Sequence, residues 1–193
     1  MTSAVRLVVA SLLLAACASG SRPSGPGETR GAVPDLRGRR VLVLPVQLRN
    51  GVPSDLTFDE ETEYALRNRS EQVSWAFPSD VAEILRRSPT VQADPHNLPV
   101  GIFLQAEVNR IGDPLYGEVR RLATLAGATV VIIPIQLRYG ADGAYHLLTT
   151  LLNPVTGRVL WLATIDGEPG PPESPVTLAT LADAYSRALV PLG

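Results

Sequence analysis

Two histidines are the residues of this sequence best suited to acid–base chemistry or metal binding. His96 lies two residues after Asp94, and this pair is either an acid–base or metal site or part of an exposed loop; one histidine beside one acid is usually a surface feature. His146 falls in an apolar segment and is expected to be half-buried. No cysteine or glutamate lies at ligand spacing from either histidine. We therefore predict no catalytic residue, no metal site and no cofactor.

The charged residues exclude further classes of function. Carboxylates gather at Asp59, Glu60, Glu61 and Glu63 and could bind a cation, but acids in the first turns of a helix are explained by the helix dipole, so a solvated face is favoured. All 17 basic residues are arginine, which excludes lysine chemistry such as Schiff bases and phosphate loops. With a formal net charge of −2 and no basic footprint, nucleic-acid binding is not expected, and no small-molecule substrate is indicated.

The only cysteine, Cys17, ends a segment that is typical of export. Arg6 precedes the uncharged residues 7–16, which suit a signal peptide and are too few to span a membrane. The segment closes with Leu14-Ala15-Ala16-Cys17, which resembles the lipobox of bacterial lipoproteins. The resemblance implies that residues 1–16 are a lipoprotein signal peptide and that Cys17 becomes the first residue and carries acyl chains such as palmitate. The alternative is an ordinary secretory signal cleaved near Ala18.

The residues after Cys17 predict where the protein is held. No aspartate follows the cysteine, which by resemblance to enterobacterial sorting signals favours the cell outer membrane, facing the periplasm. Residues 17–38 are mostly Gly, Pro, Ser and Arg with almost no large apolar side chain, so we expect a flexible tether with a root-mean-square reach of about 25 Å. Residues 39–193 have the length of one globular domain with its own hydrophobic core.

Apolar patterns and turn residues place the elements of this domain. We expect an α+β fold, an α/β sandwich in which a mixed sheet of about five strands is flanked by about four helices and ends in an antiparallel meander and a final helix. Residues 57–66 are either a short helix or a strand, with helix preferred, and residues 95–111 could contain a short helix. The other expected elements are strands at residues 40–48, 72–77, 130–138, 144–152 and 158–166 and helices at residues 78–87, 114–126 and 174–189.

One apolar phrase occurs twice in the chain. Residues 41–49 (VLVLPVQLR) closely match residues 130–138 (VVIIPIQLR). Because the flanking sequences differ, we interpret the two phrases as similar neighbouring strands of one sheet rather than as a duplicated domain. Proline has no amide donor, so Pro45 and Pro134 should each lie where strand pairing ends or bulges.

Aromatic and basic side chains are the remaining candidates for partner contacts. Trp75, close to Phe77, suits a partner interface and the core about equally well, whereas Trp161 between two leucines is expected in the core. The pairs Arg86-Arg87 and Arg120-Arg121 could face anionic lipid or peptidoglycan, and helix solvation explains them equally well.

A wider resemblance combines the lipobox and tether with the strand at residues 40–45 and the hairpin at residues 153–161 (NPVTGRVLW). These features are similar to small envelope lipoproteins related to the curli-secretion channel subunit, the lipoprotein activators of penicillin-binding proteins and the amino-terminal domain of Tol-system protein B. The resemblance implies a mixed sheet flanked by helices and a non-enzymatic role through protein contacts. We therefore expect a lipid-anchored binding or adaptor module with an unknown envelope protein as partner; the alternative is an oligomeric structural component of an envelope or secretion assembly.

Overall fold

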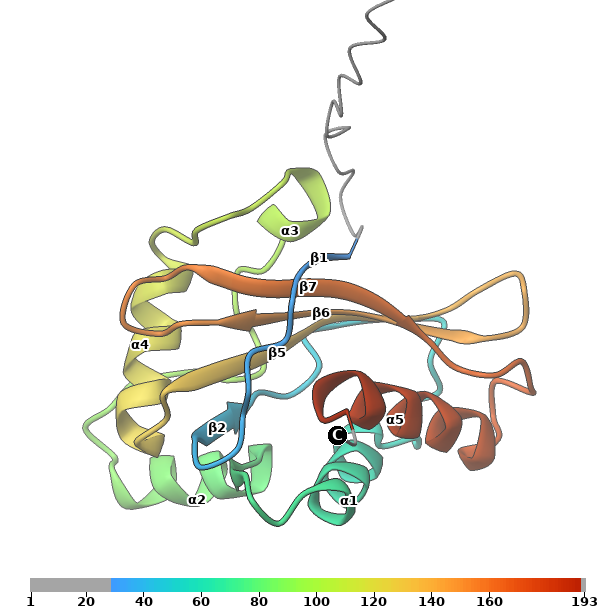
Figure 1. The fold of residues 1–193 in the computed structure, drawn as a ribbon, viewed down its shortest axis with the longest axis horizontal. Coiled ribbons are helices and arrows are strands. Elements are labelled where there is room, and N and C mark those ends of the chain that lie inside the picture. The colour runs from blue at the N-terminus through green and yellow to red at the C-terminus, as the bar shows by residue number, and fades with distance from the viewer. Residues whose placement is uncertain (1–28, 192–193) are drawn as a thin grey trace, which may run out of the picture.

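The computed structural model describes residues 29–191, which form one mixed β-sheet with helices on both faces (Figure 1). The strand order is β1-β7-β6-β5-β2-β4, and β3 also pairs with β5. This confirms the expected α+β fold, with seven strands where about five are expected. The strands are β1 Arg30–Gly31, β2 Arg40–Val43, β3 Leu48–Asn50, β4 Ser74–Ala76, β5 Val130–Tyr139, β6 Tyr145–Leu152 and β7 Val159–Asp166. The helices are α1 Phe58–Arg69, α2 Pro78–Arg87, α3 Ile102–Gln105, α4 Leu115–Ala126 and α5 Pro175–Leu189.

The two repeated phrases form neighbouring strands, as expected. β2 and β5 pair in parallel, with Val41 opposite Val130. The expected strand at residues 40–48 is divided, because Pro45 lies between the end of β2 and the start of β3. Pro134 lies at an irregularity in the ladder between β5 and β6. Both prolines therefore stand where regular strand pairing is interrupted.

The carboxy-terminal half contains the predicted antiparallel meander. β5, β6 and β7 pair in sequence order. Asn153 closes the turn from β6 to β7, since its side-chain Oδ1 accepts the amide N–H groups of Val155 and Thr156. Gly157 completes the turn with a φ of 70°, a conformation that glycine adopts without strain.

The ambiguous residues 57–66 are helical. The buried residues of α1 are Phe58, Thr62 and Leu66, whose four-residue spacing places them on one helix face. The short helix expected within residues 95–111 is α3, a single turn. α4 stops at Gly127, whose φ of 65° is the left-handed conformation that ends many helices. Within residues 29–191, no helix has the length and apolar character to cross a membrane.

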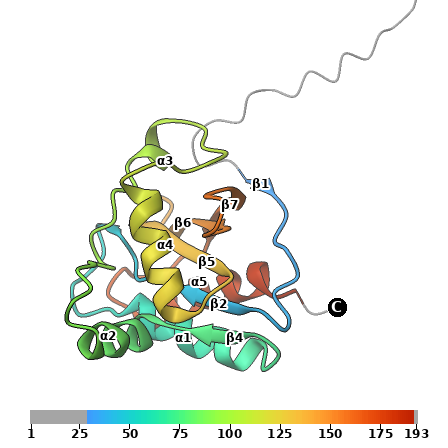
Figure 2. The ribbon, with the colours of Figure 1, turned by 90° about the vertical axis from the view of Figure 1, so that its left-hand side faces the viewer.

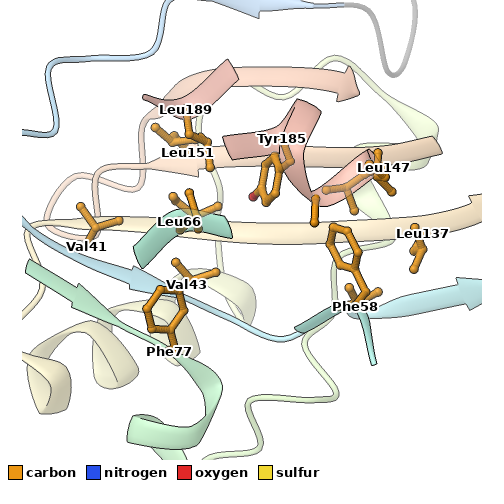
Figure 3. Packing of buried hydrophobic residues seen from close by; sticks show 14 of the residues in the cluster. Val41, Val43, Phe58, Leu66, Phe77, Leu137, Leu147, Leu151, Tyr185 and Leu189 are labelled. Atoms are coloured by element: carbon orange, nitrogen blue, oxygen red, sulfur yellow. The ribbon is translucent and has the colours of Figure 1, made fainter. Parts of the chain in front are cut away.

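Two hydrophobic cores lie on opposite faces of the sheet. α1 and α5 cover one face, and Figure 3 shows their side chains meeting those of the strands, among them Phe58, Leu66, Tyr185, Leu137, Leu147 and Leu151. α2, α3 and α4 contribute to the second core, and Figure 2 shows α4 alongside the strands. Trp161 is buried, as expected for a core residue.

Residues 30–38, expected to belong to the tether, pack against the domain. β1 pairs with β7 at the edge of the sheet. Gly31 has a φ of 73°, and a Cβ there would lie 2.2 Å from the carbonyl oxygen of Leu160, so this close approach requires glycine. Leu36 is only 3% exposed. The packed part of the chain thus begins before residue 39. Composition alone does not predict this, because the packing depends on unpaired backbone groups at the edge of β7.

Candidate functional site

A groove of about 390 Å³ runs between α1 and α5. Its floor consists of small side chains, with Ala65 on α1 and Ala179 and Ala182 on α5. Small residues at these positions allow a third backbone to approach the helix pair closely. We call this feature the α1–α5 groove, and its lining is completed by Glu61, Tyr64, Asn68, Arg69, Asp183 and Ser186.

The rim of the α1–α5 groove carries an aromatic side chain and two acids. Tyr64 is 71% exposed and presents its ring to solvent. Glu61 on α1 and Asp183 on α5 place carboxylates on both sides, and Asp183 pairs with Arg187 one turn further along α5. Arg69 is held by the carboxy-terminal segment, because its Nε–H donates to the carbonyl of Val190 at 2.9 Å. The groove therefore offers a narrow apolar floor between rims that carry two carboxylates and the guanidinium of Arg69.

The sheet beneath α1 and α5 holds the groove in shape. Tyr185 of α5 is fully buried, and its hydroxyl lies 2.9 Å from Oγ1 of Thr149 on β6. Burial raises the pKa of the Tyr185 phenol, so the side chain stays neutral. Phe58 of α1 packs against Tyr185 with their ring centroids 6.2 Å apart. Because the helices share these contacts, the groove is formed by rigid elements rather than by loops.

His146 is the centre of a charged cluster at the amino-terminal end of β6. Its Nδ1 lies 2.6 Å from Oδ1 of Asp166 on β7, and its Nε2 lies 3.0 Å from Oδ1 of Asp142 in the turn between β5 and β6. Both ring nitrogens can donate only when the imidazole is protonated. Burial alone would lower the pKa of His146, but the hydrogen bonds to Asp166 and Asp142 outweigh it and raise the pKa above 6.5. At 8% exposure, His146 is more buried than the sequence suggested.

The His146 cluster predicts that stability declines as the pH rises above 6.5. Because the folded protein holds the proton more tightly than the unfolded chain, the stabilisation is complete below the unfolded pKa and is lost as the pH rises through the raised folded pKa. The effect should be modest, since Asp142 and Asp166 are more than half exposed. Urea unfolding at a series of pH values should show a steeper decline for the parent than for His146→Gln. Equal slopes would contradict the prediction.

His96 and Asp94 meet through the backbone rather than as an acid–base pair. Oδ1 of Asp94 accepts the backbone N–H of His96 at 3.0 Å, a contact typical of a turn. Nearby, Oδ1 of Asp59 accepts the backbone N–H of Val46 at 3.1 Å. Burial raises the pKa of Asp59, and this hydrogen bond and the charges of Arg49 and His96 oppose the rise.

The acidic residues expected to form one solvated face serve different contacts. Asp59 points inward to the backbone of Val46, whereas Glu61 lines the α1–α5 groove. Glu63 pairs with Arg67 at 2.8 Å on the surface of α1. Within the described part of the chain, no group of three or more His, Cys, Asp or Glu side chains could hold a metal ion.

Trp75, the predicted partner contact, lies on the edge strand β4 outside the α1–α5 groove. It is half-buried, its Nε1–H donates to the carbonyl of Ser70 at 3.3 Å, and its ring stacks on Phe77 with centroids 6.0 Å apart. A role for Trp75 in partner binding stays a prediction. The segment Leu14-Ala15-Ala16-Cys17 lies outside the described residues, so its role also stays a prediction.

Three of the four arginines in these pairs, Arg86, Arg87 and Arg121, form local ion pairs. Arg86 and Arg87 both contact Glu83 on α2, at 2.8 Å and 2.6 Å. Arg121 on α4 contacts Glu118 at 3.0 Å. These contacts agree with helix solvation, which is one of the two explanations considered for the arginine pairs. The groove was not found from the sequence, where its signal is limited to small residues at helical spacing in α5.

Comparison with known proteins gives matches in structure only. No protein family matches the sequence, and no curated protein is similar to it. The solved structures similar to this chain include the LpoB C-terminal domain from Salmonella enterica, with 16% identity over 70% of this chain and 86% of that chain and a TM-score of 0.46. Lipoprotein GNA1162 from Neisseria meningitidis has 16% identity over 70% and 84% of the two chains and a TM-score of 0.43.

TolB from Acinetobacter baumannii is also similar, with 17% identity over 84% of this chain and 31% of that chain and a TM-score of 0.39. These structures belong to the group of envelope proteins that the sequence features resemble.

Proposed function

We propose that the protein is a lipid-anchored lipoprotein of the cell envelope that binds another envelope protein and catalyses no reaction. The observation that carries the proposal is the relative position of two features. The described chain enters the domain beside β7 and α3, whereas α1 and α5, which form the groove, lie towards the opposite side (Figure 1). An anchor at Cys17, ahead of the entry point, would leave the groove accessible from the aqueous side.

The sequence around Cys17 supports a location on the outer membrane, facing the periplasm. The lipobox resemblance supplies the anchor, and the absence of aspartate directly after Cys17 favours the outer membrane. Acyl chains on one residue suffice for stable attachment when more than one chain is present. In this arrangement the domain is a surface-bound module that meets its partner within the reach of residues 17–29.

The α1–α5 groove is suited to a helix from the partner protein. Its alanine floor between two helices allows a third helix to pack closely, as in recognition of a helix in a groove. Tyr64 provides an exposed aromatic contact, the residue type that often dominates binding energy. Glu61 on the rim favours a partner helix with small apolar residues on one side and arginine or lysine beside them, whereas the charge of Asp183 is offset by Arg187.

The residues that could support catalysis are used in structural contacts. Each ring nitrogen of His146 faces a carboxylate, and Asp94 is engaged by the backbone of His96. The carboxylate of Asp59 accepts the backbone N–H of Val46. These contacts support a non-enzymatic role, in which the surface of α1 and α5 is the functional element.

A photo-crosslinking experiment in intact cells tests this binding site. Tyr64 is replaced by benzoylphenylalanine, which keeps an aromatic ring at the rim, and Ala179→Arg is added to fill the groove. We expect a crosslinked product from position 64. Its yield should fall at least about tenfold with Ala179→Arg, which corresponds to a loss of about 1.4 kcal/mol in binding free energy. Unchanged thermal unfolding of Ala179→Arg shows that the fold is retained.

The matched control is Val155→Arg, which adds the same charge at an exposed residue of the turn between β6 and β7. This variant should leave the crosslink intact. A product that resists Ala179→Arg, or that Val155→Arg reduces equally, would reject the groove as the binding site. A product formed between two copies of this chain would favour the oligomeric alternative.

A further inference from the structure

A hollow of about 190 Å³ lies on the sheet face that carries α3 and α4, at the end where β5 and β6 meet their connecting turn. We call it the α3 hollow. The α1–α5 groove lies on the other side of the sheet. The volume corresponds to about six water molecules at about 30 Å³ each, which suits one small group rather than a drug-sized ligand. The lining includes Phe103, Leu104, Gln136, Arg138, His146 and Leu148.

An irregularity in β5 turns two polar side chains towards the α3 hollow. Ile135 packs in the core on this face and Leu137 packs in the core on the opposite face, although residues two apart in a regular strand share one face. The register of β5 against β6 shifts between Pro134 and Gln136, which accounts for the change. Beyond the shift, Gln136 and Arg138 both line the hollow. Bulges often re-aim side chains in this way next to functional sites.

The strand register sorts the lining into an apolar part and a cationic part. Leu148 lies opposite Gln136 in the ladder and belongs to the same core as Phe103 of α3. His146 lies opposite Arg138, nearer to the turn. A ligand in the hollow therefore meets apolar carbon atoms on one side and positive charge on the other.

The carboxylates near the α3 hollow are used by His146 and leave Arg138 without a partner. Asp142 and Asp166 each direct an oxygen to a ring nitrogen of His146. Burial and the nearby charge of Arg138 both oppose the raised pKa of His146, so these two cations are close in space. Within residues 29–191, the side chains of Arg138 and Gln136 form no hydrogen bond or ion pair. The hollow thus presents a guanidinium and an amide that are available to a ligand.

We propose that the α3 hollow binds a carboxylate that carries an apolar side chain, as at the carboxy-terminal residue of a peptide. The guanidinium of Arg138 can bind a carboxylate through two parallel hydrogen bonds, and the amide of Gln136 can donate another. Leu148, Phe103 and Leu104 contact the apolar side chain. A free amino acid offers the same chemistry, and the test below separates the two sources. This site is independent of the α1–α5 groove and of the anchor.

Titration of the full chain in detergent with N-acetyl-leucine tests the site, with amide resonances followed by NMR. This probe has one carboxylate, one aliphatic side chain and no amino charge. We expect saturable shifts at Leu104, Gln136 and Arg138, and none at Ala179 in the α1–α5 groove. N-acetyl-leucinamide lacks only the carboxylate charge. It should bind at least about tenfold more weakly, because a hydrogen bond to a charged group is typically worth that much.

Two substitutions and one control assign the binding to the α3 hollow. Arg138→Gln should weaken binding of N-acetyl-leucine at least about tenfold, and Leu104→Ala should weaken it about threefold through lost apolar contact. The matched control is Arg158→Gln, which removes the same charge from an exposed arginine just before β7, whereas the hollow takes Thr164 near the other end of this strand. The control should bind like the parent. Thermal unfolding of each variant shows whether the fold is retained.

A comparison of free leucine with an acetylated tripeptide that ends in leucine separates the two sources. Tighter binding of the tripeptide would identify a peptide end as the ligand, and tighter binding of free leucine would identify an amino acid. Equal binding of the carboxylate and the amide, or equal losses with Arg138→Gln and Arg158→Gln, would reject the carboxylate site. Shifts confined to the α1–α5 groove, or no saturable shift at millimolar probe concentrations, would also overturn the proposal.

Discussion

A chain with serine in place of Cys17 is expected to take up no palmitate, whereas the parent chain incorporates it. A serine hydroxyl is a far weaker nucleophile than a thiolate and does not accept the lipid. If residues 1–16 are also exchanged for a cleavable secretory signal, nearly all of the variant should move from the membrane to the soluble periplasmic fraction. Each buried methylene of the lost acyl chains contributed about 0.8 kcal/mol to membrane binding. Labelled palmitate and cell fractionation provide the measurements.

The matched control for this substitution is Ser19→Thr, which changes a neighbouring side chain and leaves the thiol intact. This control should incorporate palmitate and remain with the membrane. Absence of palmitate from the parent chain would contradict the acylation. A serine variant that fractionates with the membrane after the exchange of residues 1–16 would show that another part of the chain provides the attachment.

A fragment that starts at Arg39 is expected to be less stable than one that starts at Thr29 by about 3 kcal/mol in the free energy of unfolding. The shorter fragment lacks β1 and the buried side chain of Leu36. Loss of a buried leucine alone typically costs about 2–5 kcal/mol. In a protein of this size, the midpoint of thermal unfolding should fall by about 6–12 °C. Urea and thermal unfolding of the two fragments give the measurement.

Two substitutions in the longer fragment separate the causes of this loss. Leu36→Ala should reproduce most of it, because it removes the buried side chain and keeps the backbone. Asp35→Asn is the control, since Asp35 is exposed and pairs with Arg37 two residues away, so its effect should be within about 0.5 kcal/mol. Fragments of equal stability would show that residues 29–38 add nothing to the fold.

The elements with strong periodic patterns were predictable from the sequence. β5, β6 and β7 are apolar runs separated by turn residues, and their antiparallel order follows from the short connections. α4 and α5 have apolar residues at helical spacing and clear ends such as Gly127. The match between residues 41–49 and 130–138 indicated neighbouring strands because a shared environment selects similar side chains.

The features that were missed depend on contacts between distant residues. β1 contains only Arg30 and Gly31, which carry no strand pattern, and it is a strand because the edge of β7 is available. Asp142 and Asp166 meet His146 because the register of the meander places His146 opposite Asp166 and the turn returns Asp142 to the same end. The α1–α5 groove depends on the position of two helices that are far apart in the sequence.

The parallel pairing of β2 with β5 makes completion of the sheet depend on a late part of the chain. Thr129 donates its backbone N–H to the carbonyl of Arg40, and these residues are 89 positions apart. β2 lies between β4 and β5, so an early part of the chain obtains one of its two neighbours only after a late part has followed. Folds dominated by such distant pairings form slowly. In the exported lipoprotein that we propose, the sheet is therefore completed only after β5 has followed β2 across the membrane.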